Sequence, residues 1–185
     1  MATEILTDRL RLRDWREDPS DVDALLAVLS DPETMKMWPK PFDREGCAGW
    51  IDNVLDSYRT HGFGRFAVEL RDTGQLIGDC GLFPSAIGDW SFTDLGWILH
   101  ADHHGKGYAT EAARAIVDHA FSTLGLPELI AHMAEDHHAS RRVAERLGMV
   151  FTHSQPYEPN RGKPHLFHRL TPAEWEQSPK ASLFR

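Results

Sequence analysis

The feature that most constrains the fold is a strand, a glycine-containing loop and a helix in immediate succession. Residues 94–99 (DLGWIL) suit a strand, glycines follow at positions 105 and 107, and from Ala109 onward the apolar residues recur at helical spacing. The N-terminus of a helix has free N–H groups and a partial positive charge, and glycine lets the backbone approach an anion closely. The unit therefore predicts an anion site at residues 104–110.

The glycine spacing alone also permits a plainer interpretation. Glycine pairs are common in tight turns that bind nothing. Two familiar phosphate loops do not account for the segment, because the chain has neither a GxGxxG after a strand nor a GxxxxGK[ST]. Lys106 and His104 lie beside the glycines and add hydrogen-bond donors, which favours the anion site.

Apolar periodicity in the rest of the chain predicts a single domain, residues 1–185, of mixed α/β or α+β class around one sheet. We find no repeat and no low-complexity linker, and the elements follow one another at short spacings. The expected order is one strand, two helices, three strands, a helix, a strand, a helix and two strands. The expected strands cover residues 9–13, 66–70, 76–83, 92–99, 129–134, 149–153 and 165–170, and the expected helices begin at Ser20, Asp43, Ala109 and Ser140.

Charge and cysteine content exclude several classes of protein. A net charge of -8 disfavours nucleic acid as a partner, because that affinity depends on neutralising phosphates. Cys47 and Cys80 match no metal spacing and no disulfide framework, so we expect reduced thiols in the cytoplasm. The first residues lack the apolar segment of a signal peptide, and no run approaches the length of a membrane helix.

Eleven histidines raise the question of a metal site. Two pairs, His103/His104 and His137/His138, lie in the segments that flank the expected anion site. A metal would need three or four ligands to converge, and no HxxxH or HExxH pattern lies on an expected helix. We therefore expect no metal, and a histidine-based metalloprotein is kept only as a minor alternative.

Two segments together resemble the GCN5-related N-acetyltransferases (GNAT). Residues 104–109 (HGKGYA) are similar to the family's (Q/R)-x-x-G-x-(G/A) loop, with His104 at the first position. Residues 137–149 (HHASRRVAERLGM) are similar to its N-x-x-S-x-x-x-x-E-(K/R)-x-G-(F/M) segment, with His137 in place of Asn. The opening TDRLRLR and the later LTPAEW resemble the branch that acetylates protein N-termini, ribosomal proteins included.

The resemblance implies a mixed, mostly antiparallel sheet of about seven strands with helices on both faces. It implies acetyl-CoA as the acyl donor, with the pantetheine arm beside the fourth strand and the pyrophosphate on the loop. His104 and His137 would replace the family's usual donors to the coenzyme. The residues expected to bind acetyl-CoA are Ile98, Leu99, His104, Gly105, Lys106, Gly107, Tyr108, Ala109, Thr110, His137 and Ser140.

The same resemblance implies catalytic roles for two residues. Ser140 matches the position of a hydroxyl that often serves the departing thiolate, although a Ser in the first turn of a helix also caps backbone. Asp94 lies on the strand where many members carry a general base, although an aspartate near a strand end often faces solvent. Asp79, inside another expected strand, is a second candidate for the base and an expected residue of the acceptor site, with a structural hydrogen bond as the alternative.

The implied activity is direct transfer of acetyl to an amine of a protein N-terminus or a small molecule. Trp38, with Met37, lies between the first two expected helices, the region that shapes the acceptor pocket in this family. If these residues line the pocket, the acceptor has an apolar part, and ordinary packing is the alternative. A non-catalytic acyl-CoA sensor of the same fold is the alternative function. We expect a monomer or homodimer, with neither nucleic acid nor membrane as partner.

Overall fold

A computed structural model of the chain describes residues 3–178. They contain an eight-stranded sheet in the order β1-β2-β3-β4-β5-β6-β8-β7. All seven expected strands form, and β1 is an additional short strand that pairs with β2. The strands are β1 (Glu4–Leu6), β2 (Leu10–Asp14), β3 (Arg65–Leu70), β4 (Leu76–Ile87), β5 (Trp90–Leu99), β6 (Leu129–Ala134), β7 (Val150–Tyr157) and β8 (Lys163–Leu170).

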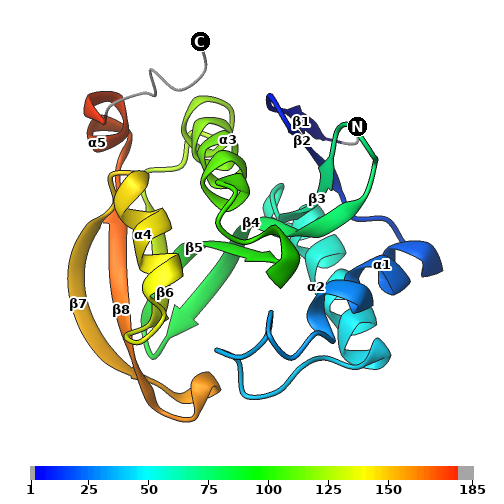
Figure 1. Ribbon diagram of the computed structural model, residues 1–185. Helices are drawn as coiled ribbons and strands as arrows, with labels where there is room; N and C mark the ends of the chain where they lie inside the picture. The colour runs from blue at the N-terminus through cyan, green and yellow to red at the C-terminus, as the bar shows by residue number, and fades with distance from the viewer. Residues whose placement is uncertain (1–2, 179–185) are drawn as a thin grey trace.

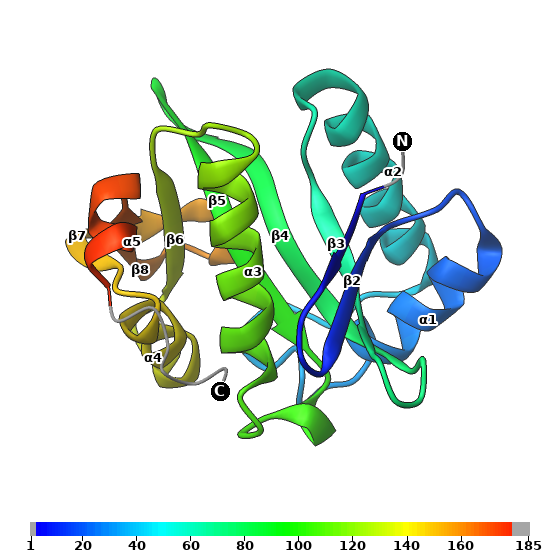
Figure 2. The same ribbon diagram turned by 90° about the horizontal axis from the view of Figure 1, so that it is seen from above.

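The sheet is mixed and mostly antiparallel, as expected. Among the strand pairs of residues 3–178, β5 and β6 alone are parallel, and their register consists of the single pair Asp94 and Ile130. All the other strand pairs have longer ladders. Strands β5 and β6 therefore diverge beyond Asp94, and the gap opens toward the loop that follows β5 (Figures 1 and 2).

Helices cover both faces of the sheet. Ala67 and Ile98 pack with residues of α1 (Pro19–Leu29) and α2 (Arg44–His61). Their chain neighbours Val68 and Leu99 pack with residues of α3 (Tyr108–Ser122) and α4 (His138–Arg146). Because successive side chains of a strand point to opposite faces, the two helix pairs lie on opposite sides. The expected helices on both faces are confirmed (Figure 2).

Local capping explains where three helices begin. Asp18, rather than the expected Ser20, caps α1, because its side chain accepts from the Ser20 N–H and Pro19 occupies the first helical position. Asp43 caps α2 as expected, and Gly62 ends that helix in the left-handed conformation. Helix α5 (Pro172–Gln177) was not predicted, although Thr171 forms a full capping box with the third helical residue, Glu174.

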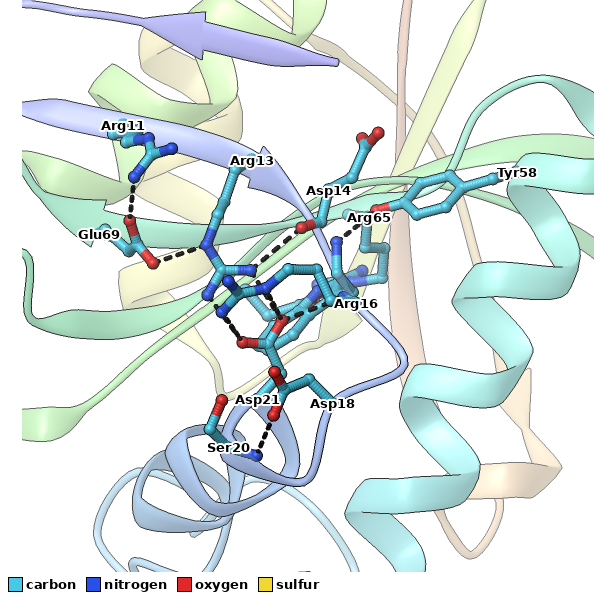
Figure 3. Close-up of polar contacts among 12 residues, drawn as sticks. Arg11, Arg13, Asp14, Arg16, Asp18, Ser20, Asp21, Tyr58, Arg65 and Glu69 are labelled. Atoms are coloured by element: carbon cyan, nitrogen blue, oxygen red, sulfur yellow. Dashed lines mark hydrogen bonds and ion pairs between the residues drawn. The ribbon is translucent and has the colours of Figure 1, made fainter. Parts of the chain in front are cut away.

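A cluster of charged side chains joins α1 to the sheet (Figure 3). Arg13 of β2 donates two hydrogen bonds to Asp21 of α1, at 2.7 and 2.9 Å, and one to Glu69 of β3 at 2.7 Å. Arg16 donates to the same Asp21 carboxylate at 2.5 Å. Burial alone would raise the pKa of Asp21, but the bonds from Arg16 and Arg13 outweigh it and lower that pKa to about 2.

Candidate active site

Two cavities meet where β5 and β6 diverge. One, which we call the groove, has a volume of about 470 Å³ and runs along the loop after β5 and the start of α3. The other, which we call the pocket, has a volume of about 350 Å³ and extends between the strands toward β7 and β8. Both cavities are lined by the same six residues at their junction: Met37, Trp38, Trp97, Ile98, His137 and Ser140.

The groove has the features of an anion site. Gly105 and Gly107 adopt φ values of 74° and 84°, which favour glycine. Gly107 is the N-cap of the fifteen-residue helix α3 and makes no side-chain capping bond, so the first-turn N–H groups have no side-chain cap. The buried Thr110 hydroxyl and His103 Nδ1 also belong to residues that line the groove, and neither atom has a hydrogen-bond partner within the described residues 3–178. These donors fit a pyrophosphate.

Arg9, near the N-terminus, holds the loop that follows β5 in place. Its Nε donates to Glu111 at 2.7 Å, its Nη1 donates to the Lys106 carbonyl at 3.0 Å, and its guanidinium lies 4.5 Å above the Tyr108 ring. The Glu111 side chain is 3% exposed. Sequence reasoning missed this contact, since the arginine and its carboxylate are about a hundred positions apart.

Most of the residues expected to bind the coenzyme line the groove, but not all of them do. His104 lines the groove, and its Nε2–H donates to the Leu99 carbonyl at 2.8 Å, so the ring shares the backbone group expected to meet pantetheine. Ile98, Tyr108 and Ala109 also line the groove. Lys106 is exposed and is not among the lining residues, whereas Arg142, from α4, is.

Ser140 lies at the junction of the two cavities, with both of its lone pairs engaged. Trp97 Nε1–H donates to the Ser140 hydroxyl oxygen at 3.3 Å. His137 accepts from the Ser140 N–H through Nδ1 at 3.4 Å and has Nε2 at 3.2 Å from that hydroxyl oxygen. Burial lowers the pKa of His137, so the neutral ring carries its proton on Nε2 and donates it to Ser140.

This arrangement leaves the Ser140 O–H without an acceptor among residues 3–178. His137 is the residue whose side chain caps α4, so the hydroxyl of Ser140 is not used for capping. A hydroxyl that accepts two N–H bonds and keeps a free proton suits a group that develops negative charge.

Asp94 lines the pocket from β5 and is largely enclosed. Its side chain is 18% exposed, so it does not face open solvent as an ordinary strand-end aspartate does. Burial raises the pKa of Asp94 to about 7, against the attraction of Arg65. A carboxylate with such a pKa suits proton transfer near neutral pH.

Asp79 lies behind the pocket wall and lines neither cavity. It is fully buried, accepts from Trp15 Nε1 at 3.0 Å and from Trp50 Nε1 at 3.3 Å, and pairs with the Arg65 guanidinium. Trp50 and Arg65 do line the pocket. The contacts of Asp79 are therefore those of the structural alternative, and it orients two side chains that line the pocket.

The pocket walls are rich in aromatic rings. Trp38 is 40% exposed, lines both cavities and packs edge-to-face against Trp50 at 6.0 Å. Further rings come from β4, β5 and β7, namely Phe83, Trp97 and Tyr157. Met37 also lines the pocket, beside Trp38.

Three polar residues of the pocket were not predicted. His132 lies on β6, His165 on β8, and Asn160 ends the short 3-10 helix η2 (Glu158–Asn160). The available signal was weak: a histidine interrupts the apolar run LIAHMA, and another opens the last strand. Chain order does not indicate that these strands meet beside β5.

Residues 3–178 show no group of three or more His, Cys, Asp or Glu side chains placed to hold a metal ion. Within the same residues, no helix combines the length and apolar character needed to cross a membrane. Cys47 and Cys80 are both buried free thiols.

Solved structures define the class to which this fold and site belong. An acetyltransferase from Agrobacterium tumefaciens has a TM-score of 0.75 and 30% identity, covering 91% of this chain and 94% of its own. A ribosomal-protein-S5-alanine acetyltransferase from Vibrio fischeri has a TM-score of 0.75 at 17% identity, over 94% of this chain and 98% of its own, and shares the fold alone. The class is that of the acetyltransferases.

Sequence comparison narrows the class to a family. The acetyltransferase (GNAT) domain family matches residues 9–150. The uncharacterized N-acetyltransferase YnaD of Bacillus subtilis is 31% identical over 147 residues, which are 78% of this chain and 81% of that protein. The chain belongs to the GNAT acetyltransferase family, and the resemblance seen in the two sequence segments is confirmed.

Proposed function

We propose that this enzyme moves the acetyl group of acetyl-CoA directly to an amine within a ternary complex. The observation that carries the proposal is the junction of the two cavities, where Ser140 and Trp97 line both. A donor held in the groove and an acceptor held in the pocket would meet at these shared residues. Such proximity by itself lowers the barrier of a two-substrate reaction.

The groove would hold the coenzyme chiefly by backbone groups. The N–H groups at the start of α3, from Gly107 to Ala109, and the unpartnered Thr110 hydroxyl would take the pyrophosphate. The diverging edge of β5 at Ile98 and Leu99 would lie along the pantetheine arm. Bound there, acetyl-CoA would supply the thioester carbonyl that the amine attacks.

Two side chains then assist the transfer, one as a base and one as a hydrogen-bond donor. Asp94 would accept the proton of the acceptor amine, which must be neutral to act as a nucleophile. The free O–H of Ser140 would donate a hydrogen bond to the sulfur as negative charge develops on it, and the thiolate would leave as such and take its proton from water. Because Trp97 and His137 donate their N–H groups to the Ser140 oxygen, the Ser140 O–H would point away from both of them.

The acceptor would be an amine attached to an apolar or aromatic body. The pocket is walled by Trp38, Trp50 and Tyr157 among other rings, and such walls bury flat apolar groups well. Both a protein N-terminus with an apolar first residue and a small aromatic amine meet this description. A highly charged polyamine does not, because its additional ammonium groups would lose their hydration in the pocket.

The test is release of free thiol from acetyl-CoA in the presence of amines that differ in apolar character. We expect thiol release with arylalkylamines and with peptides that begin with an apolar residue, and little with polyamines. Ser140→Ala should lower that rate. The alternative, a non-catalytic acyl-CoA sensor, predicts that acetyl-CoA raises the Tm while no amine releases thiol. That result, in the parent protein, would overturn the proposal.

A further inference from the structure

Three polar side chains of the pocket form a continuous hydrogen-bonded chain. Asn160 Nδ2 lies 3.0 Å from His165 Nε2, and His165 Nδ1 lies 2.9 Å from His132 Nδ1. At the end of the chain, His132 Nε2 lies 3.7 Å from Asp94 Oδ1. Asn160 and His165 are 8% and 6% exposed, so open solvent does not compete strongly for these bonds.

The direction of the chain follows from its first member. An amide nitrogen only donates, and Asn160 Nδ2 lies between two acceptors, His165 Nε2 and the Met37 carbonyl at 3.4 Å. His165 Nε2 therefore carries no proton, and the neutral ring carries it on Nδ1.

The next bond fixes the second ring. His165 Nδ1–H donates to His132 Nδ1, which must then be bare, so the proton of His132 is on Nε2. Both rings are neutral at physiological pH, because burial lowers the pKa of His132 and of His165 to about 4. The Nε2–H of His132 is the atom of the chain that faces Asp94.

We infer that His132 is a positioning residue that presents a fixed N–H donor to Asp94, and that His165 and Asn160 set its direction. At 3.7 Å the pair is longer than a hydrogen bond, so the N–H acts on the carboxylate through its dipole, which favours the ionised form and opposes the effect of burial. Under the proposed function, on which this consequence rests, the chain keeps Asp94 able to accept the proton of the amine. In this tautomer His132 has no free lone pair toward Asp94, so it does not relay that proton onward.

Other titratable and charged groups surround Asp94 from several elements. Arg65 of β3 attracts the carboxylate, although its guanidinium is already paired with Asp79. The phenol of Tyr157 from β7 and the neutral ring of His137 from α4 line the same pocket. Neither brings a positive charge, so among these groups Arg65 supplies the attraction that lowers the pKa of Asp94, and the inferred effect of His132 is that of an uncharged donor.

The first test reads the tautomers directly. Long-range 1H–15N spectra of the full-length protein should show His165 protonated on Nδ1 and His132 on Nε2. Asn160→Leu removes the amide donor at similar size, and it should leave His132 as a mixture of tautomers. A parent protein with His132 protonated on Nδ1 would overturn the inference, whether or not any amine is acetylated.

The second test compares two substitutions at His132. His132→Phe keeps a ring against Phe167, which stacks on His132 at 5.0 Å, but it has no donor, whereas His132→Gln keeps an N–H near the same place. By 13C NMR, the Asp94 carboxyl should titrate about one pH unit higher in the Phe variant and close to the parent in the Gln variant. The acidic limb of kcat/KM should move with it.

Unchanged melting temperatures in both variants would show that the fold is intact. An Asp94 titration that stays in place in a folded Phe variant would contradict the inference. Failure of the proposed function has a different signature, because it abolishes thiol release in the parent and leaves both NMR readouts unaffected.

Discussion

Asp94 is subject to two opposing influences, and its function depends on their balance. Burial favours the protonated acid, while Arg65 favours the carboxylate, and the resulting pKa of Asp94 is about 7. A general base works only when ionised. The proposed chemistry should therefore be lost as pH falls through about 7 and reach a plateau above it.

Asp94→Asn tests this role at the scale of one residue. We expect kcat/KM to fall by about 10²- to 10⁴-fold at pH 8, the usual contribution of a general base, and the pH dependence near 7 to disappear. The measurement should use an acceptor amine whose own pKa is far from that of Asp94, so that the two titrations are not confused. The Tm at pH 8 should not fall, because the substitution removes a buried charge. A variant with parental rate would show that Asp94 is not the base.

At the scale of elements, Arg9, which precedes β2, bonds both the loop that follows β5 and the first turn of α3. Gly107 has a φ of 84°, and a Cβ added there would lie 3.4 Å from Arg9 Nη2. The same arginine bonds the Lys106 carbonyl and Glu111, so a shift of the loop would be transmitted to these bonds.

Gly107→Ala should raise the KM for acetyl-CoA about tenfold while the KM for the amine changes little, because the strained position belongs to the groove. Gly74→Ala is the matched control. Gly74 has a similar φ of 71° in the turn between β3 and β4, with open space where its Cβ would be. Both variants should lose stability to a similar degree. Equal effects on the KM for acetyl-CoA would count against the loop as the pyrophosphate site.

The cluster around Asp21 makes a separate prediction about stability. The folded pKa of Asp21, about 2, is below the ordinary aspartate value of 3.8, so its contribution to stability is fully present above about pH 3.8 and is lost as pH falls through about 2. Asp21→Asn should cost about 3 kcal/mol at neutral pH, because it leaves Arg13 and Arg16 without their shared carboxylate. Chemical denaturation at several pH values checks both statements, and an Asp21→Asn cost that persists unchanged at pH 2 would contradict the pH dependence.

At the scale of the whole molecule, local patterns predicted the elements, and long-range contacts determined the site. The strand, loop and helix around Gly105 and Gly107 were predictable because φ, capping and apolar periodicity are local properties. Strand β1 was missed because three residues carry too little periodicity. Helix α5 was missed although its capping box is visible in the sequence.

Some contacts of the pocket could not be predicted from the sequence. Asp94 could be proposed from its place in a recognised strand, but its partner His132 could not, because β6 meets β5 only after a helix has been crossed. Asp79 was expected at the acceptor site or as a structural hydrogen-bond acceptor, and its enclosure by Trp15, after β2, by Trp50 of α2 and by Arg65 of β3 decides between these roles. Burial and partner identity are properties of the assembled core and do not follow from spacing.

The central claim is that groove and pocket are filled together and that acetyl passes directly between their occupants. The most direct measurement is the initial velocity of thiol release as both acetyl-CoA and the best amine are varied. A ternary complex predicts double-reciprocal lines that intersect, with no acetyl group on the protein when the amine is absent. Parallel lines, together with an acetylated protein detected by mass spectrometry, would contradict the account.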